Sequence, residues 1–147
     1  MLVKIKKIID NTLPEVEILI KAHTEQEYIT VTEKLEDKSS FATIDGIILL
    51  SKSEIMYIKS QKNYLELFTK DKIYKMRSPL YQLEKRLGDS FIRVSRSYLI
   101  NINNIDRLAT DLFLGVVAYV GNAKIPVSKN YFKVISEKIS EMGGGEN

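Results

Sequence analysis

Three short clusters of basic and polar residues supply the side chains of this sequence that could do chemistry. They lie at residues 59–64 (KSQKNY), 93–97 (RVSRS) and 128–130 (SKN). Arginine and lysine bind phosphate oxygens or form bidentate hydrogen bonds with guanine, whereas asparagine and glutamine form them with adenine. The third cluster also stands at the expected start of a helix, where backbone N–H groups suit a phosphate. Three such clusters in one chain predict a nucleic-acid-binding protein.

The residue types that most catalytic and metal sites need are almost missing. The chain has no cysteine and a single histidine, His23, which excludes disulfides, thiolate zinc sites, iron–sulfur clusters and multi-histidine metal sites. No glycine-rich phosphate loop occurs. Glu54, Glu66, Glu84 and Asp89 do not stand at a spacing that suits a catalytic carboxylate pair. We therefore predict that the protein is not an enzyme and uses no cofactor, metal or small-molecule substrate.

The charge is divided unevenly along the chain of 147 residues. Residues 1–46 hold six lysines against nine acidic residues, whereas residues 47–147 hold sixteen basic residues against ten acidic ones. This asymmetry favours an anionic partner for the basic part. Besides DNA, an acidic protein bound by the basic loops stays open as an alternative. Lysines among the first apolar residues and the absence of a long apolar run predict a cytoplasmic protein.

The acidic front predicts a small piece of two strands and a helix. Residues 3–9 and 15–22 alternate weakly between apolar and polar side chains and are rich in β-branched residues, so both favour strands. Thr24 and Glu27 form a capping box, which predicts the start of a helix. Because a piece of this size cannot bury a core of its own, we expect residues 1–45 to be an α+β extension that packs on the rest or dimerises. A linker is predicted at residues 37–40.

The basic remainder predicts a β-rich domain with two helices. Ser78 and Pro79 predict the start of one helix and Gly88 its end, and Ser128 is expected to begin the last helix. Short apolar stretches between turn residues suit antiparallel strands, and they lie at residues 47–50, 55–60, 64–69, 73–77, 91–102, 112–120 and 124–127. The buried helix stripes would be Leu80, Leu83 and Leu87, and then Phe132, Ile135, Ile139 and Met142. Residues 142–147 are expected to form a flexible tail.

The middle cluster interrupts a segment that otherwise favours a strand. Residues 91–105 read FIRVSRSYLININNI, and Arg93, Ser95 and Arg96 break the alternation. An edge strand protected by charge would explain this pattern. The segment also resembles the signature of LytTR-type DNA-binding domains, which runs aromatic–x–Arg–x–(His/Ser)–(Arg/Lys)–Ser–x–x–(Val/Ile)–Asn.

Three further motifs in the same order strengthen the resemblance. They are SEIMYI at residues 53–58, LYQLEKRL at residues 80–87 and IPVSKNY at residues 125–131. They are similar to the opening strand, the helix before the signature and the closing segment of LytTR-type domains. The resemblance covers residues 46–141.

The resemblance implies an elongated, mainly β fold of small antiparallel sheets with short helices, whose loops enter successive major grooves of double-stranded DNA. The chain is similar to stand-alone members without a receiver domain, and some of these are encoded beside membrane proteins, which suggests a functional link to such a protein. We therefore expect a sequence-specific transcriptional regulator that binds DNA as a homodimer. Its DNA-contacting residues would be Lys62, Asn63, Tyr64, Arg93, Ser95, Arg96, Ser97, Lys129 and Asn130.

Overall fold

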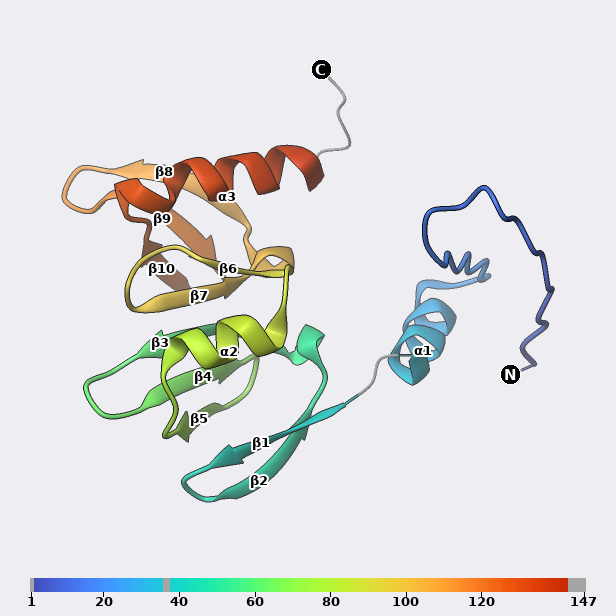
Figure 1. Cartoon of the computed structure of the whole chain (residues 1–147), viewed down its shortest axis with the longest axis horizontal. Helices are drawn as coiled ribbons and strands as arrows, with labels where there is room; N and C mark the ends of the chain where they lie inside the picture. The colour runs from blue at the N-terminus through green and yellow to red at the C-terminus, as the bar shows by residue number, and fades with distance from the viewer. Residues whose placement is uncertain (1, 36–37, 143–147) are drawn as a thin grey trace. The chain divides into compact units, whose positions relative to one another are not determined.

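The structure is a computed structural model that describes residues 2–35 and 38–142. The chain divides into two compact units, Met1–Leu35 and Glu36–Asn147, and each is described by itself (Figure 1). The predicted flexible tail lies, apart from Met142, outside the described residues.

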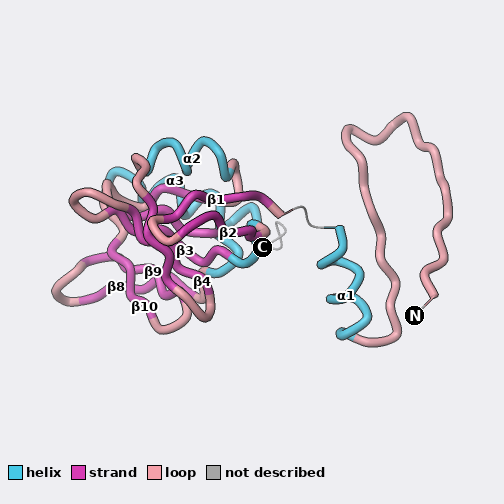
Figure 2. The backbone as a smooth tube through the Cα atoms, turned by 90° about the horizontal axis from the view of Figure 1, so that it is seen from below, coloured by secondary structure: helices cyan, strands magenta, loops and turns pink. Residues whose placement is uncertain are grey.

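The first unit contains a helix but no strand within its described residues. α1 spans Glu25–Leu35, and residues 2–22 consist of loops and turns (Figure 2). The predicted strands at residues 3–9 and 15–22 are therefore wrong, because an isolated pair of strands is marginal without a covering core. The predicted helix start is confirmed, since the Glu27 N–H donates to the Thr24 hydroxyl oxygen at 3.1 Å.

The second unit is built from three small antiparallel sheets (Figure 1). A hairpin joins β1 (Ser39–Thr43) to β2 (Gly46–Leu50). The central sheet has the strand order β5-β4-β3-β7-β6, and the third sheet has the order β10-β9-β8. Their strands are β3 (Ile55–Ser60), β4 (Leu65–Thr69), β5 (Ile73–Met76), β6 (Phe91–Arg93), β7 (Tyr98–Asn101), β8 (Arg107–Asp111), β9 (Gly115–Val120) and β10 (Ala123–Pro126). The predicted fold class, mainly β with small antiparallel sheets and short helices, is confirmed.

Three predicted segments differ from the structure. The stretch at residues 91–102 is a hairpin of β6 and β7, because the backbone turns back over residues 94–97. In the stretch at residues 112–120 the first three residues belong to the turn before β9, and only the remaining six form the strand. The strand that pairs with β9, β8, was not predicted. The first residue of the linker predicted at residues 37–40 lies outside the described residues. The prediction is wrong for the last two, which pair with β2.

Helix α2 (Leu80–Leu87) carries the predicted buried stripe of leucines. Pro79, rather than the predicted Ser78, is its N-cap residue. The Ser78 hydroxyl donates instead to the Gln82 side-chain oxygen at 3.2 Å. The helix ends at Gly88, as predicted, with a φ of +79° that glycine tolerates best.

Helix α3 (Lys129–Met142) begins at the predicted place but buries fewer side chains than predicted. Ile135 is buried and Ile139 packs against the same apolar cluster. Phe132 and Met142 are exposed, because the small third sheet covers only a narrow face of the helix.

Strands β6 and β7 are buried on both faces. Phe91 and Leu99 belong to an apolar cluster that includes the leucines of α2. Ile92 and Ile100 belong to a second cluster, which includes Ile135 of α3. Successive side chains of a strand point to opposite faces, so a strand covered on both sides needs adjacent apolar residues. The two apolar clusters explain why apolar and polar residues do not alternate in the signature segment.

Asn101 ties the end of β7 to neighbouring segments. Its side chain is almost fully buried, and its amide donates to the carbonyl oxygens of Ile55 at 3.0 Å and Lys52 at 3.3 Å. Its side-chain oxygen accepts the N–H of Asn103 at 3.1 Å. The asparagine that closes the signature therefore acts within the fold, by satisfying three backbone groups.

We expect Asn101→Ala to lower the free energy of unfolding by about 1–3 kcal/mol, because buried backbone groups lose their partners. Urea unfolding followed by circular dichroism measures this change. Asn103→Ala is the matched control, since the Asn103 side chain is exposed, and it should shift stability by less than about 0.5 kcal/mol. Equal stability of the two variants would contradict the role assigned to Asn101.

Candidate nucleic-acid interface

The structure brings the three predicted clusters together at one edge of the second unit. The Ser60 N–H at the end of β3 donates to the Ser97 carbonyl oxygen at 2.7 Å, and the Ser128 N–H donates to the Val94 carbonyl oxygen at 2.8 Å. The β6–β7 loop is thus bonded to both of the other clusters. In Figure 1 the β3–β4 loop, the β6–β7 loop and the start of α3 all lie at the left-hand edge. Residues far apart in sequence form one continuous edge.

The nine predicted contact residues fall into two groups at this edge. Five are exposed to solvent: Lys62, Asn63, Arg96, Lys129 and Asn130. The other four are partly buried: Tyr64, Arg93, Ser95 and Ser97. Because direct contact with a duplex needs an accessible polar group, the two groups differ in what they can do.

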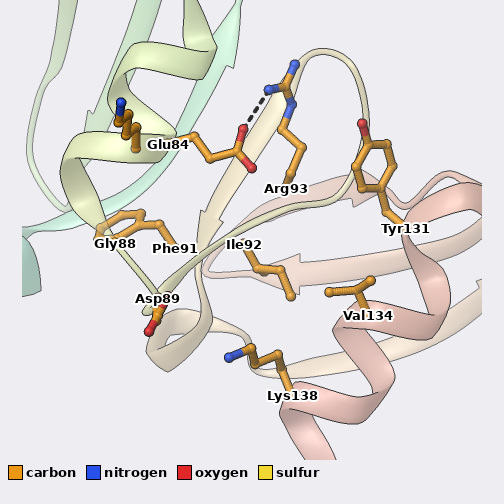
Figure 3. A pocket seen from close by; sticks show the side chains of 10 residues that line it. Glu84, Gly88, Asp89, Phe91, Ile92, Arg93, Tyr131, Val134 and Lys138 are labelled. Atoms are coloured by element: carbon orange, nitrogen blue, oxygen red, sulfur yellow. Dashed lines mark hydrogen bonds and ion pairs between the residues drawn. The ribbon is translucent and has the colours of Figure 1, made fainter.

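Arg93 holds the β6–β7 loop in shape. Its guanidinium donates to the carbonyl oxygens of Ser95 at 2.8 Å and Arg96 at 2.7 Å. A third N–H group pairs with the Glu84 carboxylate of α2 at 3.0 Å (Figure 3). The planar guanidinium carries several donors in a fixed geometry, so one side chain can fasten the loop to the helix. These bonds engage Arg93 inside the protein and set the backbone position of Arg96.

Arg93 also lines a cleft between α2, β6 and α3. The cleft has a volume of about 420 Å³, and Tyr131 reaches up from the first turn of α3 toward the β6–β7 loop (Figure 3). Tyr131 and Arg93 therefore lie on either side of the same opening beneath the loop.

The two serines of the β6–β7 loop complete its turn. The Ser95 hydroxyl oxygen accepts the Ser97 N–H at 3.2 Å, and the Val94 N–H donates to the Tyr98 carbonyl oxygen at 3.1 Å. A serine hydroxyl that bonds the backbone two residues on stabilises a tight turn. Arg96 stands between the two serines and is exposed. The turn thus presents the Arg96 side chain outward.

The β3–β4 loop is a tight turn whose ends are anchored. The Gln61 N–H donates to the Tyr64 carbonyl oxygen at 2.8 Å. The Gln61 side-chain amide donates to the Glu66 carboxylate at 2.7 Å. The Lys75 ammonium lies 4.9 Å from the centre of the Tyr64 ring, a geometry that suits a cation–π contact. These contacts leave Lys62 and Asn63 at the tip of the loop.

The third cluster forms the beginning of α3. The Ser128 carbonyl oxygen accepts the N–H groups of Tyr131 at 3.0 Å and Phe132 at 3.1 Å. Lys129 and Asn130 lie in the first helical turn and are exposed. The positive end of the helix dipole and the Lys129 ammonium act in the same direction, so this end of α3 favours an anion.

Two carboxylates close to these loops are engaged within the protein. Glu66 accepts from Gln61, and Glu84 pairs with Arg93. The Glu84 charge is compensated by Arg93, and Glu66 lies opposite Lys59 and Lys75 on the two neighbouring strands. The exposed Lys62, Arg96 and Lys129 therefore give the edge a positive character.

Two aromatic residues of the central sheet, Tyr57 and Phe68, are engaged with each other. The rings of Tyr57 and Phe68 stack with centres 4.2 Å apart, and burial raises the pKa of the Tyr57 hydroxyl. Such pairing favours a packing role for both rings.

Sequence reasoning missed the internal role of Arg93 and its partner Glu84. In the sequence Arg93 is recognisable only as part of the signature and Glu84 only as part of a helix. Their ion pair could not be predicted because it depends on how α2 packs beside β6. It also missed the turn between β8 and β9, whose exposed leucine and phenylalanine at residues 112 and 113 looked like the start of a strand.

Residues 2–35 and 38–142 lack two features. In that part of the chain no group of three or more histidine or acidic side chains could hold a metal ion. Among the same residues, no helix has the length and apolar character needed to cross a membrane.

The arrangement of sheets and helices defines the class of domain. It matches the solved structure of the LytTr DNA-binding domain of a putative methyl-accepting/DNA response regulator from Bacillus cereus, with a TM-score of 0.61 and 24% identity. The match covers 71% of this chain and 97% of that one. The sequence model of the LytTr DNA-binding domain matches residues 45–140. The chain belongs to the LytTR DNA-binding domain family, as its signature predicted.

Relatives extend the similarity beyond the fold. The chain is 30% identical over 98 residues to the sensory transduction protein LytT of Enterococcus faecalis, covering 65% of this chain and 40% of that protein. It is 26% identical over 117 residues to an HTH-type transcriptional regulator of Staphylococcus aureus, covering 76% and 80%. The chain spans about two fifths of the length of the LytT proteins that it matches.

We expect Arg93→Ala to loosen the β6–β7 loop without unfolding the domain. The amide hydrogens of Ser60 and Ser128, which bond to this loop, should exchange about tenfold faster or more, because the lost charge-assisted bonds are each worth about 1.5 kcal/mol or more. Hydrogen exchange followed by NMR measures the rates. Glu84→Gln keeps a hydrogen-bond acceptor for Arg93 and should have a smaller effect. Unchanged exchange in Arg93→Ala would contradict the bracing role.

Proposed function

We propose that the protein is a transcriptional regulator that binds a specific sequence of double-stranded DNA through its three loops. The observation that carries the proposal is the edge itself: three loops tied together by backbone hydrogen bonds, with five exposed basic or amide side chains. Side chains of this kind position a protein on phosphates and read base edges in the major groove. The membership of the LytTR family supports DNA as the partner.

The exposed residues of the edge take the contacting roles. Arg96 and Lys129 are proposed to read guanine edges, and Asn63 an adenine edge, because these side chains form the pairs that distinguish the bases. Lys62 and Asn130 are proposed to bind phosphates beside them.

The partly buried residues of the edge support the contacting ones. Arg93 and Tyr64 are proposed to position the two loops, and Ser95 and Ser97 to shape the turn that carries Arg96. Arg93 keeps a role in binding through the backbone that it holds, rather than through a contact with DNA.

Loops rather than a helix are proposed to enter the grooves. α2 and α3 are separated in sequence by five strands, so they do not form a consecutive helix–turn–helix pair. The S. aureus relative is named as a transcriptional regulator, which supports a regulatory role. A protein that acts on the bacterial chromosome works in the cytoplasm, which is where we propose this protein acts.

The first unit is proposed to dimerise the protein. Its described residues expose many large apolar side chains, among them Ile5, Val16 and Ile18. So many exposed large apolar side chains in one short segment favour an interaction site. Lysines at positions 4, 6 and 7 and glutamates at positions 15 and 17 give the segment charges of both signs, which suits pairing with a second copy of itself.

We expect Arg96→Ala to weaken binding to a specific duplex about tenfold or more and to relax the choice of base at one position, because a bidentate contact discriminates by about 1–3 kcal/mol. The duplex is first selected from a random pool with the wild-type protein. A gel-shift titration on the selected duplex and on a scrambled one measures the effect. Loss of affinity by the same factor on both duplexes would contradict base reading.

Lys72→Ala is the matched control for the loss of a positive charge. Lys72 is exposed in the turn between β4 and β5, at the opposite end of β4 from the Asn63 loop. Its removal should leave binding to both duplexes almost unchanged. Failure of the wild-type protein to enrich any duplex, together with tight binding to an acidic protein, would favour the protein-interaction alternative.

We expect Ile18→Lys to weaken self-association about tenfold or more, because burying an aliphatic side chain contributes about 1.5–3 kcal/mol and a lysine would oppose it. Sedimentation equilibrium of the full chain measures the dimer dissociation constant. Ile47→Lys, which changes an exposed isoleucine of the second unit, should have no effect. A variant Ile18→Lys that associates like the wild type would rule out this interface.

A further inference from the structure

The turn between β8 and β9 exposes two large apolar side chains almost completely. Leu112 is 97% exposed and Phe113 is 94% exposed, whereas the next most exposed large apolar residue of the described second unit, Ile47, is 76% exposed. Scattered apolar residues on a surface are ordinary. Two neighbouring side chains held wholly in water at the tip of a hairpin suggest a contact with something outside the chain.

The tip is held in one conformation by Asp111. One carboxylate oxygen of Asp111 accepts the N–H groups of Phe113 at 2.8 Å and Leu114 at 3.0 Å. The other oxygen forms an ion pair with Lys124 of β10. These bonds lower the pKa of the Asp111 carboxyl to about 2, so the turn keeps its bonds at neutral pH. A tip that is ordered before binding loses little conformational entropy when it binds.

The tip projects from the same edge as the third DNA-contacting cluster. β9 pairs with β10 from Val117 opposite Pro126, and the Val127 N–H donates to the Val116 carbonyl oxygen at 2.9 Å. The beginning of β9, which follows the tip, therefore lies beside the end of β10, which leads into Lys129. In Figure 1 the β8–β9 turn extends at the left-hand edge, next to the start of α3.

The small size and the lack of charge of the tip make the space between two base pairs a better binding site for it than the surface of another protein. A stable protein interface buries roughly 800 Å² on each partner, which far exceeds what a turn of three residues offers. The tip residues 112–114 carry no charged side chain, and the Asp111 charge is compensated by Lys124. Phenylalanine and leucine are side chains that enter the minor groove as wedges, separate two base pairs and bend the duplex.

We propose that Leu112 and Phe113 form a wedge that inserts between base pairs from the minor groove, beside the site read by the loops, and bends the DNA. This inference rests on the proposed function, because it takes double-stranded DNA to be bound at this edge. In this proposal the β8–β9 turn deforms the duplex, whereas the other loops make the contacts that select the DNA sequence.

The first experiment uses Phe113→Trp as a reporter. The chain contains no tryptophan, so this variant has a single indole at the tip. Its fluorescence should be strongly quenched when the protein binds the selected duplex, because an inserted indole stacks on bases. Ile47→Trp, at an exposed position of β2, is the control and should keep its fluorescence. An indole at residue 113 that stays unquenched at saturating DNA would overturn the proposal.

The second experiment measures the bend. Duplexes with a donor and an acceptor dye at their ends report the bend by energy transfer, and the wild type should bend the selected duplex by about 20° or more. The double variant Leu112→Ala/Phe113→Ala should lose most of this bend, yet its affinity should fall by less than about tenfold, because the cost of unstacking disappears with the wedge. Its salt dependence should match the wild type, since no phosphate contact is removed. Thermal unfolding verifies that the variant is folded.

The outcomes separate the wedge from the proposed function. A straight wild-type complex, or an equal bend in the double variant, overturns the wedge while sequence-specific binding still stands. Failure of the wild type to bind any selected duplex overturns the proposed function instead. The pair Ile47→Ala/Leu49→Ala removes two exposed apolar side chains from β2, and it should bend DNA like the wild type.

Discussion

The hydrogen bonds made by the backbone of the β6–β7 loop are the constraint on which the candidate interface depends. Its Ser97 carbonyl receives an N–H from the end of β3, and its Val94 carbonyl receives one from the residue that begins α3. Arg93 fastens the same loop to α2 through Glu84. A change in this one loop would therefore move all three clusters, which is why their relative positions can be set before any ligand is bound.

The strands on either side of that loop also join the two apolar cores. β6 and β7 send one side chain into the cluster under α2 and the next into the cluster under α3. Asn101 then closes the segment by satisfying the carbonyl groups of Lys52, just before β3, and of Ile55, the first residue of β3. The signature thus combines a structural part, which is buried, with a short exposed part around Arg96. Its buried residues hold the sheets together, and its exposed residue, Arg96, faces solvent.

Much of the second unit could be predicted from sequence, because its strands and helices carry local signals. Apolar stretches between turn residues predicted β2 to β5 and β10, and a leucine stripe predicted α2. The prediction of strands at residues 3–9 and 15–22 was wrong, because two strands alone are not stable without a larger sheet or a helix to pack against. β8 was missed because RLATD has little apolar character, and its pairing with β9 decides its conformation. The role of Arg93 could not be predicted either, because its partners lie on another element and on backbone carbonyls.

The sequence by itself determined the family, the residue types of the interface and the lack of cysteine and near lack of histidine, because these are properties of composition and spacing. Only the tertiary structure decided which of those residues face solvent. Arg93 and Arg96 are three positions apart in one basic cluster, yet Arg93 is bonded to its own protein and Arg96 is exposed. The physical reason is that the partners of Arg93, two carbonyl oxygens of its own loop and the Glu84 carboxylate, come within reach only when the loop turns back and α2 packs beside β6.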